Sequence, residues 1–596
     1  MKKKHKNLRY VMLSFLAILA LQCNYTIGGL AFDNTFLNIL NRLVVAFHAP
    51  DITDIITMVG VFLLLKTIGQ KEEKADISTG VASFVMAALF VAMLSMRNYN
   101  SFEFLTGNGF QCMLSLLCIF GIAVIIYCVL RAGCIFLTGE TTASNKTNSF
   151  VHEHLGQIGF WTIFLVWLAW IIMNYPGTYC PDMERQLREY LGDVPWSTWQ
   201  PPLSSFLMCL SYSVGKSMNN PNFGFFLYCF MQTLAGALII SYGMKKLQKL
   251  GVPDGICIAG ILFFVIVPLW GVHAQWLDKD FLYAEFTVLQ AICMMEILKD
   301  RECSTRQVVI MTAVGILACL LRNNGIYAIA PALVALCCWL KGISRKRMIE
   351  GLFVTMILYL GVQKVLYPAM GIEKGSVGEM LSVPIQQTAR YVCTYDDEVT
   401  EHEKEILSQN FHYEHLFDYD PLVSDPVKNH FTAGNLPGYF AVWWEMFWKH
   451  PGCYIEAFFA KSYGYLAPVE VHMEGWIGSS YPDYIENLGI YHPFSNQLAE
   501  IPRQLMFLGE NLPILRYFCM PGAYTWVLLF LTWFLIKRRR TFGIIMLIPS
   551  YINVLVCTAS PLHNALRYEL PVVAAMPFLV GWVYYCLTNE KEHTIQ

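Results

Sequence analysis

The chain has 596 residues, of which 55% are hydrophobic and only 14% are charged. A soluble domain carries about 25% charged residues, so the composition excludes an ordinary soluble protein and indicates one that crosses a membrane several times. The formal net charge of −2 gives no reason to expect nucleic acid as a partner.

The N-terminus joins a basic stretch, residues 2–9, to an apolar run over residues 10–21. This order is typical of a signal peptide, but no small-x-small cleavage site follows the apolar run. We therefore expect an uncleaved first span with its basic end inside the cell.

Apolar runs recur along most of the chain, and a helix that crosses the hydrocarbon core needs about 20 such residues. They predict an all-α, polytopic membrane protein with about 14 transmembrane helices. The candidate spans are residues 9–28, 52–69, 77–96, 111–137, 157–174, 222–243, 256–276, 281–298, 306–323, 325–340, 348–368, 513–536, 541–558 and 568–587.

Basic residues fall in alternate turns between these spans, which is the pattern expected when such turns face the cytoplasm. The pattern predicts a multi-pass protein of the cell membrane with both termini cytoplasmic. The loop 175–202 and the segment 370–512 then lie outside, together with the short turns near residues 278–280, 322–325 and 563–568.

Hydropathy divides the chain into four predicted parts. Residues 1–156 hold N-terminal spans, residues 157–368 hold a transmembrane core with a first outer loop at 175–221, residues 369–512 form a mainly helical outer region, and residues 513–596 hold the last spans. The short apolar run 201–218 is expected to lie on the surface or to re-enter the membrane.

The first outer loop carries the first candidate for chemistry, Asp182, among tyrosines, tryptophans and prolines. Most loop carboxylates are solvated surface acids, and that alternative stands. A carboxylate just above the bilayer can also meet a lipid-borne substrate and a soluble acceptor, and low-dielectric walls would raise its basicity, as a general base requires.

Two further outer turns carry charges where spans end. Asp278, Lys279 and Asp280 separate two apolar runs, and Arg322 and Asn323 interrupt a third. Charges at a span boundary are costly unless they pair or bind something. Snorkelling and local ion pairs are the structural alternative, and recognition of a lipid phosphate by Lys279 and Arg322 is the functional one.

The remaining candidates lie further along the chain. His563, Arg567 and Tyr568 form a third polar interruption at an outer end, and Gln387 and Arg390 share one face of a predicted helix. Each has a structural alternative as a headgroup anchor or a helix support. Together, cations at several outer ends with acids across from them indicate a site for an anionic lipid.

These motifs in this order resemble a known family. The outer acid Asp182, followed by Gln200 and then PPL at the start of the next helix, is similar to the membrane glycosyltransferases of the GT-C fold, which include protein O-mannosyltransferases and aminoarabinose transferases. Gln200 stands where those enzymes have His or Lys. A poorly characterised bacterial branch resembles the chain over residues 175–590, in the runs YPGTYCPD, WQPPL, LDKDFLYA, LRNNGIYA, VPIQQTARYV, DPVK and LRYELP.

The resemblance implies an inverting transfer of a sugar from a polyprenyl phosphate to an acceptor of the cell envelope on the outer face. Asp182 would accept the proton of the acceptor hydroxyl, and Lys279, Arg322 and Arg567 would hold the departing phosphate. Asp278 or Asp280 matches the second acid of the family. Some members use a divalent cation, but the sequence shows no clear set of metal ligands.

Two other functions stay open from the sequence. A glycolipid transporter or flippase is the first, although no inverted repeat is visible. A ligase or polymerase of lipid-linked glycans, which transfers a whole glycan, is the second.

Overall fold

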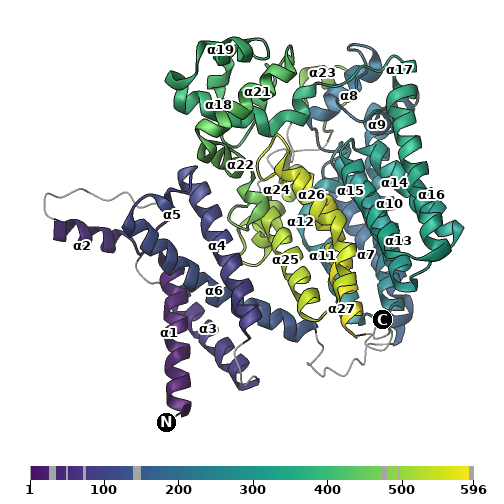
Figure 1. Ribbon diagram of the computed structural model, residues 1–596. Coiled ribbons are helices and arrows are strands. Elements are labelled where there is room, and N and C mark those ends of the chain that lie inside the picture. Colours follow the sequence, from purple (N-terminus) through teal and green to yellow (C-terminus); the bar gives the residue numbers. More distant parts are fainter. Residues whose placement is uncertain are drawn as a thin grey trace. The chain divides into compact units, whose positions relative to one another are not determined.

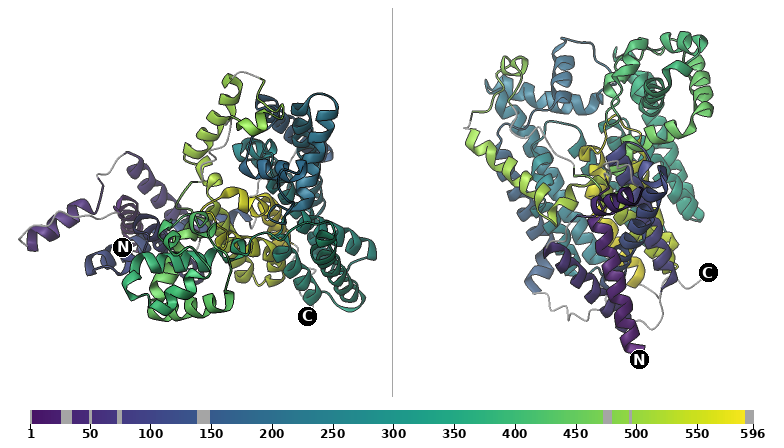
Figure 2. Two further views of the ribbon diagram at one scale, coloured as in Figure 1. Left: turned by 90° about the horizontal axis from the view of Figure 1, so that it is seen from above. Right: turned by 90° about the vertical axis from the view of Figure 1, so that its left-hand side faces the viewer.

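The computed structural model describes residues 2–25, 35–48, 52–71, 76–137, 149–471, 480–493 and 496–588. Helices account for most of these residues, and the described part of the chain forms no β-strand, only isolated bridges. The prediction of an all-α protein is therefore confirmed. The chain divides into two compact units (Figures 1 and 2).

Unit 1 comprises residues 1–142, 380–470 and 560–564. Its helices are α1 (Lys2–Gln22), α2 (Thr35–Val45), α3 (Ile52–Lys71), α4 (Ile77–Tyr99), α5 (Glu103–Thr106), α6 (Gly109–Leu137), α18 (Ser382–Tyr395), η3 (Asp396–Glu398), α19 (Glu401–Ser408), η4 (Tyr413–Asp418), α20 (Asp425–Lys428), α21 (Leu436–Lys449) and α22 (Pro451–Leu466).

Unit 2 comprises residues 143–379, 471–559 and 565–596. Its helices are α7 (Ser149–Met173), α8 (Pro181–Leu191), α9 (Pro202–Ser217), α10 (Pro221–Lys249), α11 (Asp254–Ile266), α12 (Pro268–Ala274), α13 (Asp280–Asp300), α14 (Thr305–Leu321), α15 (Gly325–Trp339), α16 (Gly342–Gly361), η1 (Val362–Leu366), α17 (Tyr367–Ala369), α23 (Asp483–Glu486), α24 (Asn496–Asn511), η5 (Leu515–Cys519), α25 (Pro521–Lys537), η6 (Thr541–Leu547), α26 (Ile548–Thr558) and α27 (Leu566–Thr588). The short helix η2 (Val377–Leu381) lies where the chain passes into unit 1.

Eight segments of the described residues are long and apolar enough to cross a membrane: Ile77–Tyr99, Gly109–Ile135, Ser149–Met173, Pro221–Lys249, Asp280–Asp300, Gly342–Ala369, Thr541–Thr558 and Leu566–Thr588. A multi-pass membrane protein is thus supported, while the larger number of about 14 spans and the side on which each terminus lies stay predictions. Three shorter apolar helices, α14, α15 and α25, account for part of the difference.

The run 256–276, expected as one span, is broken in the structure. Helices α11 and α12 meet at an angle of 60°, and Val267 between them has an extended backbone. Proline has no amide hydrogen and clashes with the preceding turn, so Pro268 ends the first helix and starts the second. The break turns the chain toward residues 275–280.

The outer region expected at residues 369–512 is mainly helical over its described part, with no β domain. Within unit 1, helices α18 to α22 enclose a core of their own that includes Tyr391, Tyr439 and Tyr454, and Figure 1 shows them as a green cluster. The division of the chain into four functional parts stays a prediction.

Unit 2 is organised around α10, which packs against α7, α9 and α13. Glycines allow the closest of these approaches: a Cβ atom on Gly224 of α10 would overlap the carbonyl group of Ser211 on α9. Helix α13 in turn packs against α14 and α27. The loops and helix ends at one end of this bundle carry most of the predicted site residues.

Candidate functional site

Two loops of unit 2 are joined side by side, and this pairing builds the site. Thr178, after α7, forms a parallel bridge with Trp276, after α12. The amide of Thr178 donates to the carbonyl oxygen of Gln275 at 2.8 Å, and the amide of Leu277 donates to that of Thr178 at 3.3 Å. The bridge places the start of α8 next to residues 278–280.

Side chains of helix α10 hold the second loop, residues 275–280, in place. Gln232 donates from Nε2 to the carbonyl oxygens of Ala274 at 2.8 Å and Trp276 at 3.1 Å. The hydroxyl of Tyr228 donates to the carbonyl oxygen of Asp278 at 2.8 Å. Satisfied backbone groups in an irregular, buried segment hold it in one conformation, so the side chains that follow are preorganised.

Asp182 lies in the first turn of α8, directly after Pro181. Proline is favoured at the first helical position because its missing amide hydrogen has no partner there. A carboxylate in the first turn also faces the positive end of the helix dipole. The sequence CPD therefore starts the helix and presents Asp182 at its exposed end.

Two cations from different elements converge on Asp182. Nζ of Lys279 lies 2.7 Å from Oδ2 of Asp182, and Nη1 of Arg567, from the first turn of α27, lies 3.5 Å from the same oxygen. The Asp182 side chain is 25% exposed, so it is reached from outside, whereas its two partners are more buried.

A third cation lies beside this group. Nη1 of Arg322, which ends α14, is 3.3 Å from Oδ1 of Asp280. The ring of Tyr568 lies near both arginines: its centre is 5.1 Å from the guanidinium carbon of Arg322 and 4.9 Å from that of Arg567. The structure thus brings Lys279, Arg322 and Arg567 together, as expected from the sequence.

Several buried polar atoms of this site have no hydrogen-bond partner among the described residues. They are Oδ1 and Oδ2 of Asp280, Oδ2 of Asp278 and Oε1 of Gln200. Arg322 approaches Oδ1 of Asp280 closely enough for an ion pair, but without the geometry of a hydrogen bond. Buried polar groups without partners are rare in folded proteins, so these four oxygens are candidates to bind a ligand.

The electrostatics of Asp182 differ from expectation. Burial acts to raise the pKa of Asp182, as expected from the sequence, but the charges of Lys279 and Arg567 outweigh it and hold the pKa below its ordinary value. The expected rise in basicity is therefore wrong for this state of the protein. The two cations are close enough to stabilise the ionised carboxylate.

Asp278 behaves in the opposite way. Burial and the neighbouring charge of Asp280 raise the pKa of Asp278 to about 6. This pKa suits proton transfer near neutral pH. Asp278 is only 1% exposed, however, so a substrate cannot reach it in this structure. Asp182 is accessible and weakly basic, and Asp278 is basic and enclosed.

The other acids of the first loop have local partners. Glu184 pairs with Arg188 at 2.8 Å and Glu189 with Arg185 at 3.1 Å, both one turn apart on α8. Asp193 accepts a hydrogen bond from the hydroxyl of Tyr484. These contacts stabilise α8 and the loop after it, which leaves Asp182 as the acid that faces the cations.

The remaining predicted residues fall into two groups. In unit 2, Asn323 donates from Nδ2 to the carbonyl oxygen of Thr198 at 2.8 Å, which ties α14 to the first loop. A side-chain hydrogen bond from Gln200 also stabilises the carboxylate of Asp182. Asn323 and Gln200 therefore support the cluster described above.

Gln387, Arg390 and His563 belong to unit 1, and each has structural partners there. Arg390 pairs with Glu456 at 2.9 Å, and Gln387 donates to the carbonyl oxygen of Tyr454 at 3.1 Å. Both ring nitrogens of His563 face acceptors, the carbonyl oxygen of Lys461 and a carboxylate oxygen of Glu470, each at 2.9 Å. These contacts favour the structural alternative, and a role in binding stays a prediction.

Comparison with known proteins shows which family the chain belongs to. A model of a family of unknown function, DUF6020, matches residues 202–595, which is more than half of the chain. The chain belongs to the DUF6020 family. No curated protein and no solved structure matches it.

The DUF6020 match includes Lys279, Arg322 and Arg567 and begins after Asp182 and Gln200. Within the matched part, sequence reasoning missed two carboxylates, Glu285 on α13 and Glu569 on α27, each buried inside a candidate span. The signal was present, because a charge inside an apolar run indicates function by default. Neither oxygen of Glu285 has a hydrogen-bond partner among the described residues.

Proposed function

We propose that this DUF6020 protein is a membrane glycosyltransferase that moves a sugar from a polyprenyl phosphate to an acceptor hydroxyl of the cell envelope, at the outer face of the cell membrane. One observation carries the proposal: Lys279 and Arg567, from separate elements, contact the same oxygen of an accessible carboxylate. An acid beside convergent cations, at the ends of apolar helices, is what proton removal next to a lipid phosphate requires.

The phosphate of the donor competes with Asp182 for the cations. A phosphate accepts hydrogen bonds from Arg and Lys as a carboxylate does, and with more oxygens. When Lys279 and Arg567 turn to the donor, the carboxylate of Asp182 loses the charges that lower its pKa, so its basicity rises. Donor binding thereby activates the base, and the unoccupied enzyme keeps it inactive.

The chemical step is a single displacement. The acceptor oxygen attacks the anomeric carbon of the sugar, the bond from that carbon to the phosphate oxygen breaks, and the acceptor proton passes to Asp182. The phosphate leaves with one more negative charge than it had in the ester, and Lys279, Arg322 and Arg567 stabilise that charge as it develops. The configuration at the anomeric carbon is inverted.

A second function, transport of a glycolipid, is favoured by other observations. The 60° break between α11 and α12 lies just before the loop of the site, and Glu285 and Glu569 are carboxylates inside candidate spans. Broken helices and intramembrane acids are common in transporters. A ligase that transfers a whole glycan would use the same cluster as the transferase.

The deciding experiment uses the purified full-length protein in liposomes with a panel of polyprenyl-phosphate sugars. One arm measures the mass of candidate acceptors, and the other measures whether the donor crosses the bilayer. Addition of one sugar supports the transferase, and addition of a whole glycan supports the ligase. Movement of intact donor with no change in acceptor mass contradicts both and supports the transporter.

A further inference from the structure

A group of metal-ligating side chains lies in unit 1, and none of them belongs to the proposed transferase site. His415 and Asp418 lie on η4, and His430 lies just after α20. One ligand atom from each residue lies within 4.8 Å of those of the other two. The imidazole rings of His415 and His430 stack at 3.6 Å between centres and 9° between planes.

The backbone on both sides of this group is held in place. Phe411 and Phe431 form an antiparallel bridge, and the amide of Thr432 donates to the carbonyl oxygen of Asn410 at 2.8 Å. Leu416 and Val427 are buried in the core below, together with both phenylalanines. The histidines therefore project from a rigid support, which a metal site needs for a fixed geometry.

We propose that His415, Asp418 and His430 bind one transition-metal ion, with Zn²⁺ as the best match. Two imidazoles and one carboxylate are a common ligand set for zinc, with water in the fourth position. Harder ions such as Mg²⁺ and Ca²⁺ prefer oxygen ligands and suit this set poorly. Asp418 is exposed and both histidines are partly exposed, so the ion can enter and the fourth position is open.

Binding of one ion requires side-chain movement, because two face-to-face stacked imidazoles direct their ring-nitrogen lone pairs parallel to one another and not toward a common point. Nδ1 of His415 lies 2.7 Å from Oδ2 of Asp418, at hydrogen-bond distance, whereas two ligands of one tetrahedral zinc ion lie roughly 3.3 Å apart, given bonds of about 2.0 Å. Rotation of the Asp418 side chain provides this difference, and rotation of one imidazole out of the stack lets both rings face the same ion. The ring of His412, with its centre 6.1 Å from that of His415 and 6.5 Å from that of His430, is near enough to supply a fourth ligand after rotation.

The alternative is a metal-free surface ion pair. His415 and Asp418 are three residues apart on one helical turn, and such exposed pairs contribute little to stability. In that alternative His430, which comes from another part of the chain, contributes a ring stacked on that of His415. The two explanations differ in what happens when zinc is added.

The test uses the full-length protein in detergent, with an affinity tag that contains no histidine. The protein is treated with EDTA, freed of chelator and titrated with Zn²⁺. We expect about one bound ion per chain by elemental analysis and a higher thermal midpoint with zinc than without it, because an ion that binds the folded state stabilises it. Failure of the wild-type protein to bind zinc at micromolar concentration overturns the proposal, whatever the variants do.

Variants then assign the ligands. His415→Ala, His430→Ala and Asp418→Asn should each weaken zinc affinity by at least about 10- to 100-fold, the range measured when even the outer partners of metal ligands are removed. His402→Ala, which changes an exposed histidine on α19 of the same unit, should bind zinc like the wild type. Equal zinc binding by the wild type and by a variant with both His415→Ala and His430→Ala would place the ion elsewhere and overturn the assignment.

Discussion

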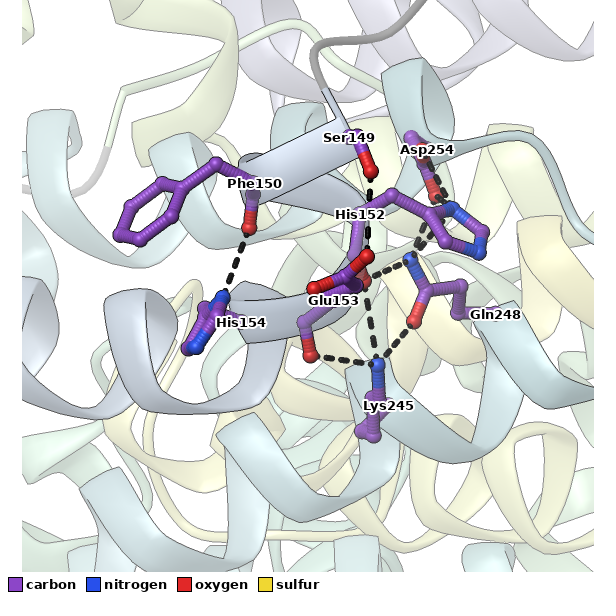
Figure 3. A network of polar contacts seen from close by, with 8 residues as sticks. All are labelled: Ser149, Phe150, His152, Glu153, His154, Lys245, Gln248 and Asp254. Atoms are coloured by element: carbon purple, nitrogen blue, oxygen red, sulfur yellow. Dashed lines mark hydrogen bonds and ion pairs between the residues drawn. The ribbon is translucent and has the colours of Figure 1, made fainter.

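Two polar clusters lie toward opposite ends of α10 in unit 2, and they differ in how completely their groups are paired. The first cluster lies near the first half of the helix and contains Asp182, Lys279 and their neighbours. Tyr228 of α10 holds it by a hydrogen bond to the carbonyl oxygen of Asp278. Near the last turns of α10, Lys245 and Gln248 meet His152 of α7 and Asp254 of α11 (Figure 3). Residues 228 and 245 are roughly 25 Å apart along the helix axis, at 1.5 Å per residue.

The second cluster is fully paired. Gln248 donates from Nε2 to Oδ1 of Asp254 at 2.6 Å, and His152 lies 2.9 Å from Oδ2 of the same carboxylate. Lys245 donates to the carbonyl oxygens of His152 and Glu153. Of the eight residues drawn in Figure 3, all of them in the described part of the chain, none has a buried side-chain nitrogen or oxygen without a partner.

The contrast separates two uses of buried charge. In the Asp254 cluster the polar groups satisfy one another and hold the ends of α7, α10 and α11 together. In the Asp182 cluster, Asp278, Asp280 and Gln200 retain oxygens without partners among the described residues. Unpaired buried groups cost stability. Their presence in the Asp182 cluster and their absence from the described residues of the Asp254 cluster therefore favour ligand binding at the Asp182 cluster.

The largest effect is expected for Asp182→Asn, which keeps the size of the side chain and removes the proton acceptor. Loss of general-base assistance should lower transfer by about 10²–10⁴-fold, while the protein still folds and inserts. The rate of sugar transfer to acceptor in liposomes is the measurement.

Asp193→Asn is the matched control, because Asp193 lies in the same loop and accepts its hydrogen bond from Tyr484. It should cost far less. Near-normal transfer by Asp182→Asn would remove Asp182 as the base and direct the search to Asp278.

Each of the two clusters contains a lysine, Lys279 in one and Lys245 in the other, which allows the next test. Lys279→Met should weaken donor binding by roughly 10- to 100-fold, the effect of losing a hydrogen bond to a charged group of about 1.5–3 kcal/mol. Lys245→Met, in the paired cluster, should leave donor affinity unchanged. Affinity for a polyprenyl-phosphate sugar, measured by competition in detergent, distinguishes the two, and equal losses would contradict a phosphate site at Lys279.

The third prediction uses pH. The pKa of Asp278 is raised from 3.8 to about 6 in the folded protein, so the folded state binds the extra proton more tightly than the unfolded state. The resulting stabilisation is present below pH 4 and is lost as the pH rises through about 6. Asp278→Asn should therefore stabilise the protein at pH 8, by at most about 3 kcal/mol, and have little effect at pH 4. A stability difference that does not change between these pH values would contradict the burial of an unpaired charge.

Much of this architecture could be predicted from the sequence. Long apolar runs define the helices, and charges at their ends identify Asp182, Lys279, Arg322 and Arg567, because ionisable groups in such positions must pair or bind. The break at Pro268 could be expected too, since proline interrupts a helix. These features depend on local composition, which a sequence displays directly.

Other features depend on contacts between distant segments and were not predictable. The lowered pKa of Asp182 arises from Lys279 and Arg567, and the sequence does not state how close they come. The proposed metal ligands His415 and His430 lie in segments that the bridge between Phe411 and Phe431 brings together. Arg390 and His563 carry the same kind of signal as Arg322, yet the fold gives them structural partners.

The smallest predicted effect tests the paired cluster itself. Asp254→Ala removes the acceptor for Gln248 and His152, and it also removes an acid from the first turn of α11, where it faces the positive end of the helix dipole. The loss should be about 1–3 kcal/mol in the free energy of unfolding, because the buried Nε2 of Gln248 keeps the carbonyl oxygen of His152 as an acceptor but loses the carboxylate of Asp254. The His152 side chain is 61% exposed, so water replaces its contact at little cost. Chemical denaturation in detergent measures the change, and sugar transfer measured at a temperature where the variant stays folded should equal that of the wild type. A variant that keeps its stability and loses transfer would reverse the assignment of the two clusters, because the paired end of α10 would then be the functional one.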